Sequence, residues 1–410
     1  MIRLAVQLST CRFVGASLSA WAAALTIHLG LAIGSLHVMS LTLWFLVPRR
    51  LWKHVGLFFA VASSSGTVVL LRYLRGISTG EENDKLRGLA DDTSKIIDLN
   101  LTWMGAFLAS TFGFHSFFKN MAVSCGSFPE GADKDLRTWI LWYTSLPEPQ
   151  FAKGNLVKAS AAAILKRASL MIIKLGALTA LLSTSPSNQQ ATISPFVATG
   201  QGSSVAPIVT IILNYYSQLW WLYLMASFCM DFGSLLVMMQ GADTEPPFAN
   251  PLLQSRSYRE AWGERWNRPV HLFLKRTVYK PLRKAGVSGF TAAILTFLSS
   301  GILHEYNFYC HNYQAYQFGS AIIFFCAMGL FMMLERVVAD ANTNANSGSL
   351  LVCPLWLQRW AASIPTPVHA IMLQSVVVPI FVPFFFQSWV DSGMLASFGD
   401  LVPHWECLSG

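Results

Sequence analysis

Charged residues are scarce in this chain, and long stretches lack them altogether. Asp, Glu, Lys and Arg make up 12% of its 410 residues, whereas soluble domains usually contain about 25%. The long runs without any of these four residues are 13–48, 55–71, 99–118, 175–230, 285–304, 306–334 and 360–390. A helix of roughly 20 apolar residues crosses the hydrocarbon core of a membrane. The repeated runs therefore exclude an ordinary soluble protein and indicate a multi-pass membrane protein.

The same runs predict an all-α fold. Backbone groups in lipid must pair within their own segment, which favours helices over open strands. Allowing two crossings in the longest runs gives about eight or nine transmembrane helices. The first run is too long for the core of a cleaved signal peptide, so we expect it to stay as a membrane anchor. The polar stretch at 72–98 is predicted to be a loop with a short helix, and those at 183–204 and 342–349 a loop and a flexible connector.

Repeats and cysteine motifs are also missing. No fixed period and no duplicated half is visible, so residues 1–410 are predicted to form a single membrane domain. The seven cysteines are scattered without a CxxC pair, which predicts neither a disulfide framework nor a metal site. We expect no metal and no tightly bound cofactor. Nucleic acid is not an expected partner, because no known binding motif accompanies the basic residues.

Basic residues are concentrated in one polar segment, residues 241–285. This segment holds nine Lys or Arg residues against four acidic ones, and the whole chain has a net charge of +8. Lys and Arg are enriched in cytoplasmic loops of membrane proteins. The segment is therefore predicted to lie at the cytosolic surface, where anionic lipid headgroups would also attract it.

Within this segment the residue order predicts two amphipathic helices. Ser255 or Ser257 can cap the first helix. Trp262 and Trp266 are four residues apart and share one face of it. Pro269 cannot continue that helix but suits the first turn of a second one. Two such helices at the interface could simply anchor the segment to the membrane surface, and the residues alone leave that alternative open.

A histidine and a glutamate, His304 and Glu305, end an otherwise apolar run. Such residues are costly in a membrane unless they face a cavity, a partner or the interface. Burial favours the neutral imidazole, which is the form that acts as a general base. A plain interfacial position at a helix end explains His304 equally well. The other histidines are predicted to be structural; they are His28, His37, His54, His115, His271, His311, His369 and His404.

Four short motifs occur between residues 247 and 306. They are Ser-Arg-Ser, Trp-Gly-x-Arg-Trp-Asn, Val-Tyr-Lys-Pro and Ser-Gly-x-x-His-Glu. Their order resembles the membrane-bound O-acyltransferase superfamily, and most of all the plant-type wax ester synthases. The resemblance implies an internal reaction chamber and a catalytic pair, Asn267 and His304, which lie 37 positions apart. Ala261 stands where this pattern has an aromatic residue and Glu264 where a basic one is frequent, which puts the exact substrate in doubt.

The resemblance also implies the chemistry. A fatty acyl group would pass directly from acyl-CoA, as cosubstrate, to a long-chain alcohol, with His304 as general base. Asn267 would polarise the thioester carbonyl or orient the substrate. Supporting roles are expected for Trp266, Ser300 and Glu305. Glu305 could orient the imidazole or interact with the helix terminus, and the second role is favoured. The CoA phosphates would find charged partners among Arg256, Arg259, Arg265, Arg268 and Lys275.

Several alternatives remain open at this point. The acceptor could be a diacylglycerol, a sterol or an isoprenoid alcohol. A proton-coupled transporter could use His304 and Glu305, and a non-catalytic scaffold needs neither. Use of acyl-CoA suits the endoplasmic reticulum. The basic segment at residues 241–285, from here on called the motif segment, would face the cytosol. If residues 285–304 simply left the cytosol, His304 would lie near the far face and Asn267 on the near one. The resemblance implies instead a chamber reached from both faces, which requires a tilted or late-starting helix, or a re-entrant helix before it.

Overall fold

The computed structural model describes residues 11–14, 34–79, 105–184, 206–311, 318–343, 363–391 and 404–407, and most of them are helical. The predicted connectors at 183–204 and 342–349 lie almost wholly outside the described residues. The stretch at 72–98, predicted as a loop with a short helix, is helical as far as Thr79, and the rest of it lies outside the described residues. The two short outer segments form one antiparallel pair, β1 (Cys11–Val14) with β4 (His404–Cys407).

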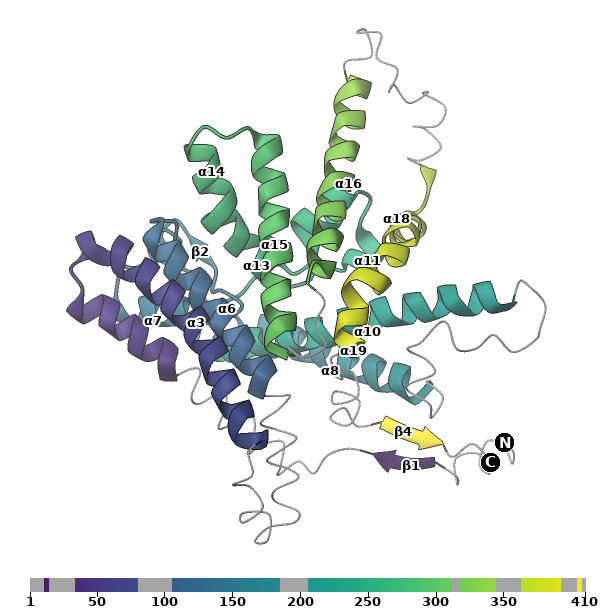
Figure 1. Cartoon of the computed structure of the whole chain (residues 1–410), viewed down its shortest axis with the longest axis horizontal. Helices are drawn as coiled ribbons and strands as arrows, with labels where there is room; N and C mark the ends of the chain where they lie inside the picture. Colours follow the sequence, from purple (N-terminus) through teal and green to yellow (C-terminus); the bar gives the residue numbers. More distant parts are fainter. Residues whose placement is uncertain are drawn as a thin grey trace.

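The N-terminal helices form one packed group, at the left of Figure 1. It contains a helix over Gly34–Leu46, a short 3-10 turn η2 (Arg49–Leu51), α3 (Trp52–Thr79), α6 (Gly105–Ser124) and α7 (Leu136–Thr144). α3 and α6 approach closely at Gly56, where a Cβ atom would lie 2.9 Å from the carbonyl oxygen of Asn120. The centre of the group is aromatic, because Trp52, Trp139 and Trp142 are all buried.

A pair of long helices follows, α8 (Ala161–Thr184) and α10 (Ala206–Met239), after the small hairpin β2 (Phe151–Ala152) and β3 (Asn155–Leu156). α8 lies along α10. Between them Asp231 accepts a hydrogen bond of 2.9 Å from Arg167 and pairs with Lys174. Charges in an apolar environment need such partners.

The C-terminal helices carry the candidate base. α15 (Gly289–His311) and α16 (Ser320–Thr343) stand side by side in Figure 1. They touch at Gly301, where a Cβ atom would lie only 2.7 Å from the Cα atom of Ile322. α18 (Thr366–Phe381) continues through a π-helical turn, η7 (Val382–Phe386), into α19 (Gln387–Asp391).

The basic segment forms short helices, as predicted. They are α11 (Pro251–Gln254), α12 (Tyr258–Glu260), η4 (Ala261–Arg265), α13 (Arg268–Leu274), η5 (Lys275–Tyr279) and α14 (Lys280–Lys284). Ser257 caps α12, because its hydroxyl accepts a 2.9 Å bond from the backbone N–H of Glu260. Pro269 lies in the first turn of α13. Both expectations about where the two helices begin are confirmed.

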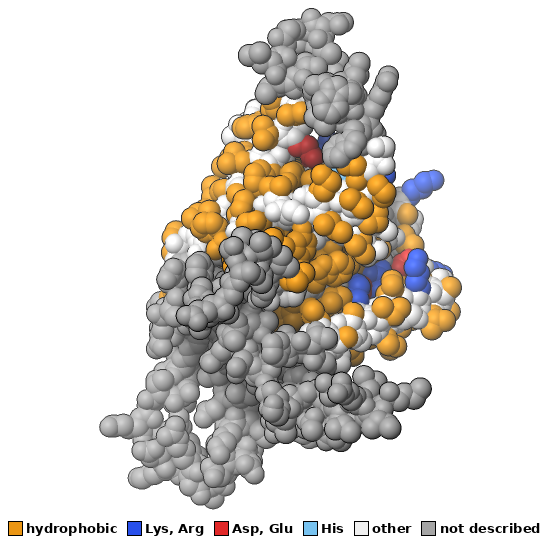
Figure 2. Space-filling view, turned by 90° about the vertical axis from the view of Figure 1, so that its right-hand side faces the viewer, with side chains coloured by type: hydrophobic (Ala, Val, Ile, Leu, Met, Phe, Trp, Pro, Cys, Tyr) orange, Lys and Arg blue, Asp and Glu red, His pale blue; other side chains and the backbone are white. Residues whose placement is uncertain are grey.

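Three helices of the described chain are long and apolar enough to cross a membrane: Ile211–Met239, Ser320–Asp340 and Thr366–Trp389. Figure 2 shows that hydrophobic side chains cover most of the described surface on the face it presents, while Lys and Arg gather near one edge. Exposed apolar residues such as Ile173, Leu213 and Leu330 suit contact with lipid. The chain is a helical membrane protein, and the larger number of eight or nine crossings stays a prediction.

Candidate active site

His304 lies on α15 inside a group of aromatic rings. Phe325 of α16 stacks on the imidazole with ring centroids 4.4 Å apart and an interplanar angle of 29°. Phe385 of η7 meets the same ring edge-on at 5.1 Å. Side chains from α16 and η7 thus pack against the imidazole that α15 carries. Close packing of this kind restricts the orientation of the ring.

The backbone determines which nitrogen of His304 carries the hydrogen. Nδ1 lies 2.8 Å from the carbonyl oxygen of Ser300, one turn earlier in α15. A carbonyl oxygen can only accept, so Nδ1–H donates and Nε2 keeps its lone pair. This arrangement leaves Nε2 able to take a proton. Ser300 therefore contacts His304 through its main chain.

Glu305 is turned away to a neighbouring helix. Its carboxylate accepts hydrogen bonds of 3.1 Å from the backbone N–H groups of Gly319 and Ile322. These groups lie at the start of α16, where unsatisfied N–H groups and the helix dipole favour a negative charge. These contacts place the carboxylate of Glu305 at the terminus of the following helix, and its role in the site stays a prediction.

Asn267 occupies a strained position between two helices. Its backbone is left-handed, with φ 39° and ψ 59°, a conformation that Asn tolerates better than most residues. Main-chain bonds fix the turn around it, from Ala249 N–H to Arg265 (3.0 Å) and from Arg268 N–H to Pro247 (2.8 Å). Its side-chain oxygen is buried and has no hydrogen-bond partner among the described residues. A buried, unpaired acceptor is costly unless something outside the chain satisfies it.

An unbroken series of ring contacts joins the residue next to Asn267 with His304. Trp266 lies 5.2 Å from Trp262, which lies 5.7 Å from Phe324. Phe324 in turn lies 5.1 Å from Phe325, the ring that stacks on His304. Trp266, the neighbour of Asn267 in the chain, and His304 thus lie at opposite ends of one aromatic cluster. Phe325 and Phe385 carry no signal in the sequence, because they are two among many phenylalanines in apolar runs.

The motif segment joins this aromatic cluster because it packs along α16. Tyr258 stacks on Phe331 of α16 with ring centroids 5.4 Å apart, and Trp262 contacts Phe324, seven positions nearer the start of the same helix. The segment therefore runs along α16 toward the level of His304. This course is consistent with the internal chamber that the sequence predicted.

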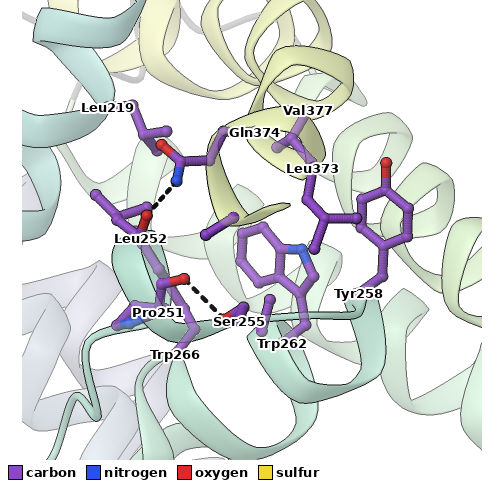
Figure 3. Close-up of a pocket in the computed structure, with 12 residues that line it drawn as sticks. Leu219, Pro251, Leu252, Ser255, Tyr258, Trp262, Trp266, Leu373, Gln374 and Val377 are labelled. Carbon is purple, nitrogen blue, oxygen red and sulfur yellow. Dashed lines mark hydrogen bonds between the residues drawn. The ribbon is translucent and has the colours of Figure 1, made fainter. Parts of the chain in front are cut away.

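A small apolar pocket lies at the edge of the aromatic cluster (Figure 3). We call it the α11–α18 pocket, because these two helices face each other across it. It is lined by Leu219, Pro251, Leu252, Ser255, Tyr258, Ala261, Trp262, Trp266, Ala370, Leu373, Gln374 and Val377. Trp266 is the predicted site residue that lines it. Asn267 and His304 lie outside its walls, so the pocket is a neighbour of the candidate site.

Most of the basic residues predicted to bind CoA are engaged within the chain. The guanidinium of Arg256 donates to the hydroxyl of Thr366 at 2.6 and 2.9 Å. Arg265 pairs with Glu260, and Arg268 pairs with Glu245.

Arg259 and Lys275 are the other two. Within the described part of the chain, neither side chain has a hydrogen bond or ion pair. These two cations are therefore the ones that remain available to an anionic ligand.

A second buried cluster, centred on Glu148, was not predicted. Its carboxylate accepts from Lys119 of α6 (2.8 Å), from the indole N–H of Trp142 in α7 (3.1 Å) and from Arg276 of η5. Burial raises the pKa of Glu148, but the two cations outweigh it and hold the pKa at about 2. The cluster ties the motif segment to the N-terminal group. In the sequence Glu148 is an ordinary residue between two prolines.

Comparison with known proteins gives two kinds of match. The profile of the family described as MBOAT, membrane-bound O-acyltransferase, matches residues 143–352, just over half of the chain. An Arabidopsis thaliana protein named probable long-chain-alcohol O-fatty-acyltransferase 9 is 30% identical over 168 residues, 39% of this chain and 45% of that protein. The related protein numbered 8 is 29% identical over 144 residues, 33% of this chain and 41% of that protein.

A third relative from the same plant, named acyl-CoA–sterol O-acyltransferase 1, is 40% identical over 77 residues. That match covers 17% of this chain and 22% of that protein. The chain thus matches less than half of the length of each of these relatives.

Proposed function

Because the chain belongs to the membrane-bound O-acyltransferase family, we propose that it transfers a fatty acyl group from acyl-CoA to a long-chain alcohol and so forms a wax ester. His304 acts as the general base and Asn267 polarises or orients the reacting group. The observation that supports this most directly is the hydrogen bond from Nδ1 of His304 to Ser300, which leaves Nε2 with a free lone pair. The names of the long-chain-alcohol relatives support the choice of acceptor.

In the proposed reaction the alcohol gives its hydroxyl proton to Nε2 of His304 as its oxygen attacks the thioester carbonyl carbon. A carbon–oxygen bond forms, and the carbon–sulfur bond of the thioester breaks. The departing CoA thiolate then takes the proton from the imidazolium, which returns His304 to its starting form. Transfer is direct, so no acyl group is attached to the protein. Proton transfer of this kind typically contributes ~10²–10⁴-fold to the rate.

Asn267 has an amide suited to binding at the reacting centre. Its N–H₂ group can donate to the thioester oxygen, where negative charge develops. Its buried oxygen, which lacks a partner among the described residues, can accept from a donor group of the substrate. The strained backbone at this position fits a functional demand on the residue, because such strain persists where the surrounding structure enforces it.

We assign the donor side of the reaction to the basic segment. Arg259 and Lys275 are proposed to contact the CoA phosphates, since the other three predicted cations have partners within the chain. Acyl-CoA is a cytosolic compound, which suits a cytosolic orientation of residues 241–285. An endoplasmic reticulum membrane fits the same chemistry.

The test uses purified protein reconstituted in lipid vesicles, with radiolabelled palmitoyl-CoA and hexadecanol as substrates. His304→Ala should lower turnover by ~10²–10⁴-fold. His54→Ala is the matched control, because His54 is an exposed histidine on α3, outside the site. If His304→Ala folds normally and keeps ester synthesis near the wild-type rate, His304 is not the base.

Asn267→Ala separates catalysis from binding. We expect kcat to fall by ~10²–10³-fold, the usual effect of removing one oxyanion donor, with a smaller change in the KM for palmitoyl-CoA. Equal effects on kcat and on substrate binding would mean that Asn267 binds the substrate and does not stabilise the transition state.

A sterol acceptor is the second candidate, favoured by the relative named as a sterol O-acyltransferase. Direct competition between hexadecanol and a sterol for labelled palmitoyl-CoA decides between them. Predominant sterol ester would overturn the proposed acceptor while keeping the acyl-transfer chemistry. Lipid analysis after expression in cells that lack neutral-lipid synthesis extends the comparison to diacylglycerol and isoprenoid alcohols.

A further inference from the structure

The reaction as proposed makes no use of the α11–α18 pocket, although it adjoins the aromatic cluster. Figure 3 shows its two walls, one from the motif segment and one from α18. None of its 12 lining residues is charged. Two of its polar side chains donate hydrogen bonds to the backbone. Ser255 donates to the carbonyl of Pro251 at 2.7 Å, and Gln374 donates to the carbonyl of Leu252. The pocket therefore offers hydrocarbon surface to a ligand.

The surroundings of the pocket suit a molecule that arrives from the bilayer. Leu253, Ile371 and Met372 are next to lining residues in the chain, and their side chains are 41–47% exposed. Two of these three lie on α18, one of the helices able to cross a membrane. Arg256, the cation next to the pocket in the chain, is bonded to Thr366 at the start of α18. An apolar chain dissolved in lipid finds matching surface here, whereas a CoA phosphate does not.

The pocket is also connected with the candidate base. Trp262 lines the pocket and contacts Phe324, which begins the series of rings that ends at His304. The pocket and the imidazole therefore border the same cluster of packed rings.

We infer that the α11–α18 pocket holds the tail of the acceptor alcohol, and that Ala261 and Ala370 determine how much of that tail fits. The inference rests on the proposed function. These two small side chains come one from each wall, Ala261 from η4 and Ala370 from α18. Their neighbours include the large side chains of Trp262 and Leu373. A larger group at either alanine occupies space that the tail needs.

The first test measures chain-length profiles in vesicles. In one arm palmitoyl-CoA is fixed and the alcohol ranges from decanol to octadecanol; in the other hexadecanol is fixed and the acyl-CoA ranges from lauroyl to stearoyl. We expect Ala261→Phe to lower kcat/KM for octadecanol at least about tenfold relative to decanol, a loss typical of a few methylenes excluded from an apolar site. The profile for acyl-CoA should not change.

Leu373→Ala is the companion variant, because it widens the pocket and remains informative if Ala261→Phe folds poorly. It should shift the optimum toward longer or branched alcohols. Val376→Ala is the matched control, since Val376 lies on the same helix with its side chain 48% exposed, outside the pocket. A shift confined to the acyl-CoA arm, or no shift in either arm while ester is still made, would overturn the inference.

A binding measurement separates this inference from the proposed reaction. Hexadecanol with a photoreactive diazirine at its tail is bound to the wild-type protein, irradiated, and the labelled residues are located by mass spectrometry. Label in residues 251–266 or 370–377 supports the pocket even if no ester is formed. Label exclusively elsewhere rejects it even if the enzyme is active.

Discussion

Neutralising Glu148 should strongly destabilise the packing of the motif segment against the N-terminal helices. Its carboxylate is shared by Lys119, Trp142 and Arg276, which belong to three separate helical elements. Glu148→Gln keeps the size of the side chain but leaves the buried Lys119 and the partly buried Arg276 without a counter-charge. Breaking a buried ion pair from one side typically costs about 3–5 kcal/mol.

The pKa of Glu148 gives an independent magnitude. Burial raises the pKa, but Lys119 and Arg276 outweigh burial and lower it from its ordinary value of 4.5 to about 2. A shift of this size corresponds to roughly 3 kcal/mol of extra stability for the charged form. The value from breaking the ion pair and the value from the pKa shift agree in order of magnitude. A typical domain is stable by about 5–15 kcal/mol, so Glu148→Gln should remove a large part of that stability.

The assay is thermal unfolding in detergent micelles near neutral pH, followed by tryptophan fluorescence. Glu130→Gln is the matched control, because Glu130 is exposed on a nearby turn. Adding Lys119→Met to Glu148→Gln should recover part of the lost stability, since one of the two uncompensated cations is then gone. An unfolding midpoint for Glu148→Gln equal to that of Glu130→Gln would refute the reasoning.

The dependence on pH follows from the direction of the shift. A carboxylate whose pKa is lowered by folding contributes its full stability above its unfolded pKa and loses it as the pH falls toward the folded value. The difference between wild type and Glu148→Gln should therefore be complete above about pH 4.5 and shrink toward pH 2. A difference that stays constant over this window would show that the charge of Glu148 is not its source.

Two further predictions concern the helix that carries His304. Gly301→Ala should reduce ester synthesis by about tenfold or more, because its Cβ atom would meet the backbone of Ile322 at 2.7 Å and overpacking of 1–3 kcal/mol forces helices apart. Ser300→Ala is its control, which keeps the carbonyl that His304 uses and should stay near wild type. Glu305→Gln should cost about 1 kcal/mol of stability through the charge lost at the start of α16, with turnover retained. A loss of turnover of ~10²-fold or more would instead assign Glu305 to the imidazole.

Local features of the motif segment could be predicted from the sequence. The cap at Ser257, the new helix at Pro269 and the shared face of Trp262 and Trp266 all depend on residues within one or two turns. The membrane environment was equally predictable, because repeated uncharged runs of this length are typical of membrane-spanning helices and rare in soluble domains. Asn267 and His304 were singled out by motif order, and their catalytic roles remain a proposal.

The surroundings of the site depend on contacts that no local pattern encodes. Phe325 and Phe385 flank His304 only because α15, α16 and η7 pack together, and nothing distinguishes them from other phenylalanines before that packing is known. Glu148 likewise gains its importance from cations contributed by distant helices.

Ala261 illustrates the division between sequence and tertiary structure. From the sequence alone, Ala261 is only a small residue at a position where the family pattern has an aromatic one. Only the tertiary structure places it in the wall of a pocket opposite α18, more than a hundred positions further along the chain. The physical reason is that helix ends and apolar runs are determined by neighbours along the chain, whereas a cavity is the space left between side chains that folding brings together.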